Sequence, residues 1–356
     1  MAQAIAAVGE GIISPILKVR LPFLHRLDCF IKIWILKTLA RLAYEAHKAL
    51  HPPSPSIRPT LIKRYPCRPS LQTRIFFPPN GGRVVDEKPK GGKGKGNTLP
   101  VFFCIHGGGF AVGSPHYDDG FCSMLARRTG MLVVSLDYSK SPLHPFPAGV
   151  RDVEALADAV LADPSLPIDP TKVSIGGFSA GGNLALGASQ LPLLQNRIRA
   201  AVIFYPIVDW SHSQDVKLAR RPYRPEDAPA DSLESSGYWF DWAYVSVGQD
   251  RCDPVLSPCY AKPQDLPPWV YMIGAQWDML RLESQEMIHA LAGLEDKKDQ
   301  EADFEQGTYK WTLARGCKHG FTHHFWQTPE EKARREKKCE PIFQEISDWL
   351  IKALRD

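Results

Sequence analysis

The sequence GFSAGGN, residues 177–183, lies between a β-branched run at 173–175 and an alanine- and leucine-rich stretch at 180–192. This order predicts a strand, a sharp turn and a helix, with Ser179 raised above a sheet at the turn. Glycines two positions before and two positions after the serine remove side chains that would collide in so tight a turn. A helix that begins there also directs unpaired N–H groups and the positive end of its dipole toward the hydroxyl. The context therefore favours a nucleophilic serine over a chance match to a short motif.

A second glycine-rich stretch, HGGGF at residues 106–110, directly follows an apolar run at 101–105. When a serine attacks a carbonyl group, the carbonyl oxygen becomes an oxyanion, and backbone N–H groups must approach it closely. Glycines permit that approach because they carry no side chain. Three glycines can also form a plain flexible loop, but the position after a buried strand and upstream of the serine turn favours an oxyanion loop.

A serine hydroxyl needs a base to act as a nucleophile, and eleven histidines compete for that role. His319 is the best placed, because it follows the last apolar run, at 309–313, near the end of the chain. His323 and His324 lie close by and remain rivals. Histidines elsewhere are expected to orient loops or to form local hydrogen bonds.

The base in turn needs an acid that fixes its tautomer and stabilises its charged form. Asp278 is the first choice, since it lies in the loop beyond the predicted strand at 269–273. Asp278 could instead simply cap the helix that begins next to it, as aspartate often does. Glu283 is the runner-up and Asp303 stands behind it. With Asp278 as the acid, the chain order is serine, acid, histidine.

The rest of the chain alternates between strand and helix patterns. Short apolar or β-branched runs recur at 73–77, 101–105, 131–136, 173–175, 200–205, 269–273 and 309–313. Helical patterns lie between most of them and at the end, at 117–129, 148–162, 180–192, 281–294 and 341–354. This alternation predicts an α/β fold with a mostly parallel central sheet and helices on both faces. Residues 209–268, rich in proline, tryptophan and tyrosine, break the rhythm and are expected to lie over the top of the sheet.

The N-terminal region predicts one long amphipathic helix. Its apolar side chains recur at helical spacing and form a stripe of Leu24, Leu27, Ile31, Trp34, Ile35, Leu39 and Leu42. We expect this stripe to pack on the protein's own core or to cover a pocket. The alternative is weak contact with a membrane surface, which Trp34 and the basic polar face favour. Lys32 and Lys37 interrupt the apolar run, so a spanning helix is not expected.

Composition excludes several classes of protein. Of the 356 residues, 44% are hydrophobic and 23% charged, which argues against a disordered chain, a coiled coil or a multi-span membrane protein. The 43 basic and 39 acidic residues leave a formal charge of +4, too weak and dispersed to indicate nucleic-acid binding. The eight cysteines show no C-x-x-C spacing, so neither a metal site nor a cofactor is expected. The cysteines are scattered along the chain, which is typical of proteins in a reducing compartment. Residues 1–20 lack the pattern of a secretory signal, so we expect a cytoplasmic protein.

Four stretches together resemble the hormone-sensitive-lipase-like branch of the α/β-hydrolases, which includes carboxylesterases and arylacetamide-deacetylase-like enzymes. They are HGGGF at 106–110, Asp137-Tyr138 with His144-Pro-Phe-Pro, GFSAGGN at 177–183, and Asp278-Met-Leu with His319-Gly-Phe. The resemblance covers about residues 71–350, and the combination is specific. It implies an α/β-hydrolase fold with a helical cap. It also implies a triad of Ser179, Asp278 and His319, and oxyanion donors at Gly108, Gly109 and Ala180.

The same resemblance implies a division of the chain. The family builds its cap from an N-terminal segment and from an insertion before the acid, and residues 1–60 and 209–268 stand at those places. Residues 61–356 would then form the hydrolase domain that carries the insertion. Six aromatic residues of the insertion are expected to make an enclosed pocket: Trp210, Tyr238, Trp239, Phe240, Trp242 and Tyr244.

Two departures from the family's pattern concern substrate range. The residue before the serine is usually acidic in the family, whereas here it is Phe178. The residues after Asp137-Tyr138 usually read Arg-Leu-Ala-Pro, whereas here they read SKSP at 139–142. Neither departure removes a catalytic group, but Phe178 makes the serine turn less charged than in relatives.

The leading functional hypothesis is a serine hydrolase that cleaves carboxylic esters of small to medium, largely apolar molecules through an acyl-enzyme. A cyclase or eliminase of specialised metabolism that reuses the same pocket is the first alternative, because a fold does not fix a function. A ligand-binding receptor on this scaffold is the second alternative. Receptors of that kind tend to lose the histidine, whereas His319 is present. The number of subunits does not follow from the sequence.

Overall fold

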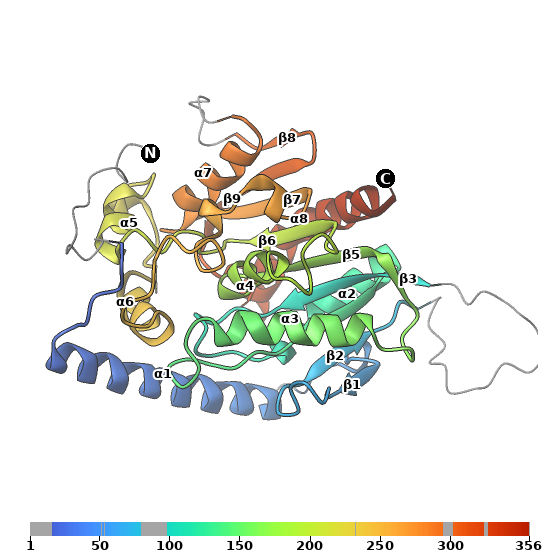
Figure 1. Cartoon of the computed structure of the whole chain (residues 1–356), viewed down its shortest axis with the longest axis horizontal. Coiled ribbons are helices and arrows are strands. Elements are labelled where there is room, and N and C mark those ends of the chain that lie inside the picture. Colours follow the sequence, from blue (N-terminus) through green and yellow to red (C-terminus); the bar gives the residue numbers. More distant parts are fainter. Residues whose placement is uncertain are drawn as a thin grey trace, which may run out of the picture.

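The nine strands that the structure describes form one sheet at the centre of the molecule (Figure 1). The computed structural model describes residues 16–50, 52, 54–79, 98–231, 233–294, 302–323 and 327–355. The strands are β1 (Leu61–Lys63), β2 (Thr73–Phe76), β3 (Leu99–Ile105), β4 (Leu132–Leu136), β5 (Ile168–Phe178), β6 (Ala200–Phe204), β7 (Trp269–Trp277), β8 (Phe304–Gln306) and β9 (Tyr309–Lys318).

The sheet is mostly parallel, as predicted. Its strand order is β1-β2-β4-β3-β5-β6-β7-β9-β8. The six strands from β4 to β9 in that order run parallel to one another. Antiparallel pairs occur only toward the two edges of the described sheet, where β1 pairs with β2, β2 with β4, and β8 with β9. Parallel strands need helical crossovers, which place helices on both faces.

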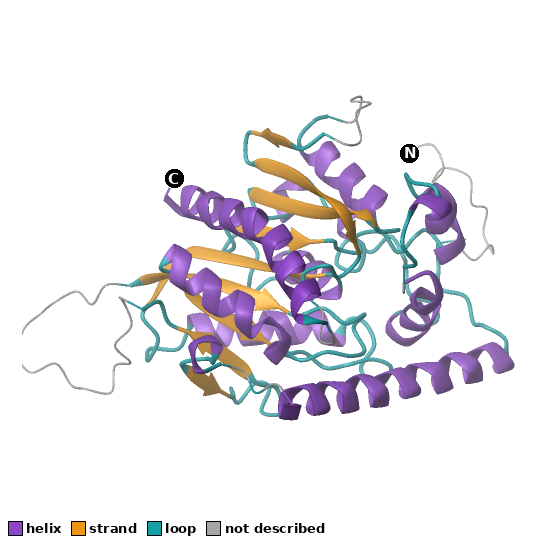
Figure 2. Ribbon diagram, turned by 180° about the vertical axis from the view of Figure 1, so that it is seen from behind, coloured by secondary structure: helices purple, strands orange, loops and turns teal. Residues whose placement is uncertain are grey.

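Helices cover both faces of the sheet and create two hydrophobic layers (Figures 1 and 2). Consecutive residues of β3 alternate between these layers, so that Phe103 packs with one and Phe102 with the other. This explains why the central strands read as continuous apolar runs, because both faces are buried. One layer contains α3 (Ala148–Leu161), α4 (Ala180–Ser189) and α7 (Arg281–Leu291), and the other contains α2 (Asp119–Thr129) and α8 (Pro329–Arg355).

The segment 209–268 adds helices and turns, and its described residues form no sheet strand. Two helices, α5 (Gln214–Arg220) and α6 (Leu233–Tyr244), contact each other. The segment also contains the short 3-10 turns η3 (Pro225–Asp227), η4 (Pro258–Tyr260) and η5 (Pro263–Asp265), whereas η1 (Pro55–Ile57) and η2 (Pro115–Asp118) lie earlier in the chain.

The N-terminal helix α1 (Phe23–Leu50) runs along one edge of the molecule and packs against α6 (Figure 1). Its Ile33 is fully buried with Ala111 and Ala243. The Lys37 ammonium donates hydrogen bonds to two backbone carbonyls, that of Ala111 at 2.9 Å and that of Ser141 at 2.8 Å. These contacts fix α1 to α6 and to the loops that follow β3 and β4.

The helix lies where it was predicted, but the expected orientation of its apolar stripe is wrong. Six stripe residues are between 43% and 74% exposed, and these are Leu24, Leu27, Ile31, Ile35, Leu39 and Leu42. The side that contacts the protein instead carries Cys29, Ile33 and Lys37, where Ile33 packs with Ala243 of α6 and the Lys37 ammonium has two carbonyl acceptors. Of the stripe, only Trp34 is partly buried against α6. No helix within the described ranges is both long and apolar enough to cross a membrane.

Replacing Ile33 with alanine is expected to destabilise the protein by about 2–4 kcal/mol, because the side chain is fully buried. The matched change Ile35→Ala, on the outer side of the same helix, should cost less than about 0.5 kcal/mol. Urea unfolding of the two variants, compared at equal m-values, measures the difference. Equal destabilisation by both changes would contradict this orientation of α1.

Candidate active site

Ser179 occupies a strained turn between β5 and α4. Its backbone adopts φ 53° and ψ −117°, a conformation that side-chain-bearing residues rarely adopt. The turn is pressed against β3, and a Cβ on Gly181 would collide with the carbonyl oxygen of Ile105. Glycine at 181 is therefore required by the close approach of two backbones, which is the arrangement that the sequence predicted for this turn.

A hydrogen-bonded chain joins Ser179, His319 and Asp278. The Ser179 hydroxyl lies 2.8 Å from Nε2 of His319, and Nδ1 of the same ring lies 2.7 Å from Oδ2 of Asp278. The pairing of Trp277 with Lys318 at the ends of β7 and β9 explains the second contact, because Asp278 and His319 are the next residues on each strand. Nδ1–H donates to the carboxylate, which leaves Nε2 free to accept the serine proton.

The fully buried Asp278 carboxylate has a second role. Its Oδ1 accepts a hydrogen bond from the Leu280 N–H at 2.9 Å, which closes the turn before α7. Asp278 does not cap that helix, because α7 begins at Arg281 and Leu280 is its N-cap residue. Burial alone would lower the pKa of His319. The charge and hydrogen bond of Asp278, with help from Asp231, outweigh burial and raise that pKa above its ordinary value.

The rival acids and bases have other partners. The Glu283 carboxylate accepts the Val208 N–H at 2.9 Å and pairs with Lys217 at 2.6 Å. Asp303 accepts the Leu313 N–H at 2.9 Å. His323 lies 2.9 Å from Asp118, while His324 falls outside the described residues. Neither Glu283 nor Asp303 therefore competes with Asp278 for the contact with His319.

The glycine loop after β3 turns back beside Ser179. The Gly108 carbonyl accepts hydrogen bonds from Ala111 at 3.1 Å and Val112 at 2.9 Å, which closes the loop into a tight turn. Gly108 and Gly109 both have positive φ, 121° and 56°. Gly109 lines one pocket together with Ser179 and with Ala180, the first residue of α4. Two of the three residues predicted to bind the oxyanion thus face the same cavity as the serine.

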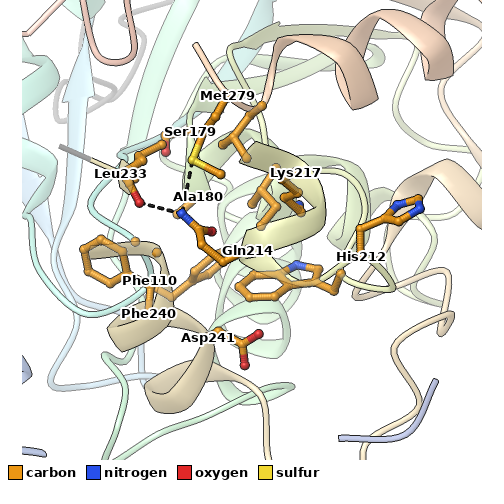
Figure 3. Close-up of a pocket in the computed structure, with 15 residues that line it drawn as sticks. Phe110, Ser179, Ala180, His212, Gln214, Lys217, Leu233, Phe240, Asp241 and Met279 are labelled. Carbon is orange, nitrogen blue, oxygen red and sulfur yellow. Dashed lines mark hydrogen bonds between the residues drawn. The ribbon is translucent and has the colours of Figure 1, made fainter. Parts of the chain in front are cut away.

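The cavity above Ser179 has a volume of about 520 Å³ up to and including its open mouth. Its wall is aromatic and aliphatic near the serine and polar on the side of α5 (Figure 3). The Gln214 amide donates to the Leu233 carbonyl at 2.6 Å and to Met279 Sδ at 3.1 Å, so it closes one side of the cavity. The lining consists of Gly109, Phe110, Ser179, Ala180, Ile207, Trp210, His212, Gln214, Lys217, Leu233, Gly237, Phe240, Asp241, Met279 and Leu280.

Only two of the six predicted pocket aromatics, Trp210 and Phe240, line this cavity. Tyr244 lies behind it, stacked on Phe110 with ring centroids 3.7 Å apart. Tyr238 is 42% exposed on the outside of α6. The other two, Trp239 and Trp242, pack with Ile33 of α1. The prediction for these four residues is wrong because α6 is covered on one side by α1, and only one side of a helix can face the pocket.

Two contacts near the site had no signal in the sequence. The Phe240 ring lies so close to Gly109 that a Cβ there would be 2.5 Å from it, so α6 rests directly on the glycine loop. The Tyr205 ring lies edge-on to His319 with centroids 5.0 Å apart, and its hydroxyl hydrogen-bonds Thr322. Tyr205 therefore holds the loop that carries His319. Both side chains come from long-range packing rather than from any local motif.

A family model described as alpha/beta hydrolase fold matches residues 102–313. An ethyl acetate hydrolase from Pseudomonas putida is 33% identical over 159 residues, which cover 43% of this chain and 48% of the relative. A versiconal hemiacetal acetate esterase from Aspergillus parasiticus is 28% identical over 208 residues, or 55% of this chain and 60% of the relative. The chain thus spans about half the length of these curated relatives.

The solved structures show a likeness over nearly the whole fold. An esterase from Pyrobaculum calidifontis aligns with a TM-score of 0.66 at 23% identity and covers 94% of this chain and 99% of its own. At this identity the likeness concerns the fold, and it confirms the predicted fold class. Within the described residues, no group of three or more histidine, cysteine, aspartate or glutamate side chains is arranged to hold a metal ion.

The contact between His319 and Asp278 can be tested without measuring activity. NMR titration of the His319 ring should give a pKa above 6.5, and Asp278→Asn should lower it, because the raising charge is gone while burial remains. Glu283→Gln, a matched change of a second buried carboxylate, should leave the His319 titration in place. A larger shift with Glu283→Gln than with Asp278→Asn would show that the acid has been assigned to the wrong residue.

Proposed function

The chain belongs to the family of proteins with the alpha/beta hydrolase fold, and from that premise we propose that it is a serine hydrolase acting on carboxylic esters. The observation that carries the proposal is the chain of hydrogen bonds from Ser179 through His319 to Asp278. Its placement at the floor of a cavity beside the glycine loop gives a bound ester access to the hydroxyl. The esterases among the curated relatives support the same reaction class, and the motifs around Ser179 and His319 support the hormone-sensitive-lipase-like branch.

In the proposed reaction, Ser179 Oγ attacks the ester carbonyl carbon while Nε2 of His319 takes the hydroxyl proton. Asp278 holds the ring in the tautomer that leaves Nε2 unprotonated, and stabilises the imidazolium that forms. His319 then returns the proton to the departing alkoxide, and the acyl group stays on Ser179. Water then attacks the acyl carbonyl carbon while His319 takes its proton. The bond from the acyl carbon to Ser179 Oγ breaks, His319 returns the proton to Oγ, and the acid leaves. Because neutral His319 is the base, the rate should fall as pH drops through its raised pKa.

The oxyanion formed at each attack is proposed to bind the backbone N–H groups of Gly108, Gly109 and Ala180. The start of α4 supports this role, because the first N–H groups of a helix have no partner within the helix. No cofactor or metal takes part in the proposed reaction. All eight cysteines lie within the described ranges and are free thiols. Their state supports the proposed cytoplasmic location.

We propose that residues 1–60 and 209–268 form a cap on a hydrolase domain of residues 61–356. The contact of α1 with α6, and the α6 residues that line the cavity, support this division. The wall near Ser179 is largely apolar, with Phe110, Trp210 and Phe240 as its aromatic members. Such walls, with few polar groups beside Ser179, support a preference for small to medium, largely apolar esters.

Ser179→Ala is expected to lower turnover of a soluble ester by about 10⁴-fold or more, because loss of a triad nucleophile has effects of that size. The unfolding midpoint should change little. Ser70→Ala, at an exposed serine far from the cavity, serves as the matched control. Turnover by Ser179→Ala within a few-fold of the parent would refute the assignment of the nucleophile. Absence of an acyl-enzyme in the parent protein, despite tight binding of the ester, would favour a receptor.

Substrate length should be limited by Phe240. The parent protein is expected to have a higher kcat/KM for short acyl esters, from acetyl through butyryl, than for palmitoyl esters. A series of chromogenic esters measures this. Phe240→Ala removes a ring from the wall beside Gly109, so the preference should shift toward longer acyl chains by roughly tenfold. Tyr238→Ala changes an exposed ring on the same helix and should leave the preference as it is. High activity of the parent on long-chain emulsions would contradict the proposed pocket size.

A further inference from the structure

The side of α1 that faces away from the protein carries a long arc of exposed apolar side chains, interrupted by the polar residues Asp28, Thr38 and Glu45. We define the outer face of α1 as Leu24, Leu27, Ile31, Ile35, Leu39 and Leu42, each more than 40% exposed. The helix has 28 residues, which corresponds to a length of about 42 Å. Val19 and Leu21, which precede the helix, and Phe23, its first residue, are also exposed apolar side chains, with 69%, 39% and 67% exposure. Exposed apolar side chains gathered in this way on a protein surface mark an interaction site.

Basic side chains border the outer face. With 100° of rotation per residue, Lys32 falls on one edge of the apolar arc and Arg41 on the opposite edge. Arg20 and Lys48 are also exposed near the two ends of the helix. The exposed acidic residues between them are Asp28 and Glu45, and Asp28 pairs with Lys32 at 2.7 Å. The exposed charges around the outer face therefore leave a positive excess.

We propose that the outer face of α1 docks on an anionic membrane surface, with the helix lying parallel to it. Apolar side chains would enter the boundary between headgroups and acyl chains, while the basic residues at the edges contact the headgroups. A second copy of the chain is a poorer occupant, because two such faces would bring two surfaces with a positive excess of charge together. The inner side of α1 stays attached through Ile33 and Lys37, so docking needs no rearrangement of the fold.

The docked orientation would bring the cavity close to the lipid. The helix α6 lies between α1 and the cavity, since Phe240 both packs with the Ile33 cluster and lines the pocket. Only α6 therefore separates α1 from the cavity above Ser179. This geometry holds whatever reaction Ser179 performs, so the docking proposal can be tested separately from the proposed function.

The test is co-sedimentation of the full chain with vesicles of phosphatidylcholine and phosphatidylserine, compared with vesicles of phosphatidylcholine alone. The parent protein should bind the anionic vesicles, and less so as salt is raised. Ile31→Gln with Ile35→Gln should weaken partitioning at least about tenfold, because both side chains would be buried in the docked state. Ile62→Gln with Leu193→Gln removes two side chains of similar exposure, 51% and 46%, from other surfaces, and should bind like the parent.

A second pair of changes separates charge from apolar contact. Arg41→Gln with Lys48→Gln should reduce binding to anionic vesicles and leave the weak binding to neutral vesicles as it is. All variants should keep the parent's helical content by circular dichroism. The proposal is overturned if the parent binds neither the anionic nor the neutral vesicles. It is also overturned if the variant with Ile31→Gln and Ile35→Gln binds as well as the control with Ile62→Gln and Leu193→Gln. It is also overturned if the parent is a dimer in solution that the outer-face pair converts to monomers, because the face would then belong to a second copy.

Discussion

Parallel pairing of neighbouring strands is the constraint on which the site depends. Ile105 of β3 stands opposite Gly177 of β5, so the glycine loop and the serine turn leave the sheet side by side. At the other pair, Trp277 of β7 stands opposite Lys318 of β9, and the next residue of each strand is Asp278 and His319. Shifting either register by one residue would separate the groups that must meet. The chemistry thus rests on backbone hydrogen bonds several residues away from any reacting atom.

Much of this arrangement could be predicted because the signals are local. A glycine two positions from Ser179 is demanded by the carbonyl of Ile105, so the motif itself encodes the contact. Continuous apolar runs indicate strands buried on both faces, and they gave the central strands correctly. The short edge strands β1 and β8, three residues each, were not predicted, because so few residues carry no periodicity.

The sequence could not indicate which side of each added helix faces inward. The apolar stripe of α1 predicted a buried face, but the buried side instead packs Ile33 on α6 and directs the Lys37 ammonium to two backbone carbonyls. The aromatic residues of α6 are shared between α1 and the cavity, and composition alone cannot divide them. Tyr205 and Phe240 act through contacts between distant segments, which no short pattern records.

The Phe240 ring touches both Gly109 and the cluster beneath α1, and this has a consequence for how such a protein diversifies. Substitutions at inward-facing positions of α1 would tilt α6 and move that ring, and so change the shape of the cavity with Ser179, His319 and Asp278 left in place. The cavity could therefore change over generations through a helix that does not line it. A mutagenesis library confined to the residues around the chamber would overlook that route.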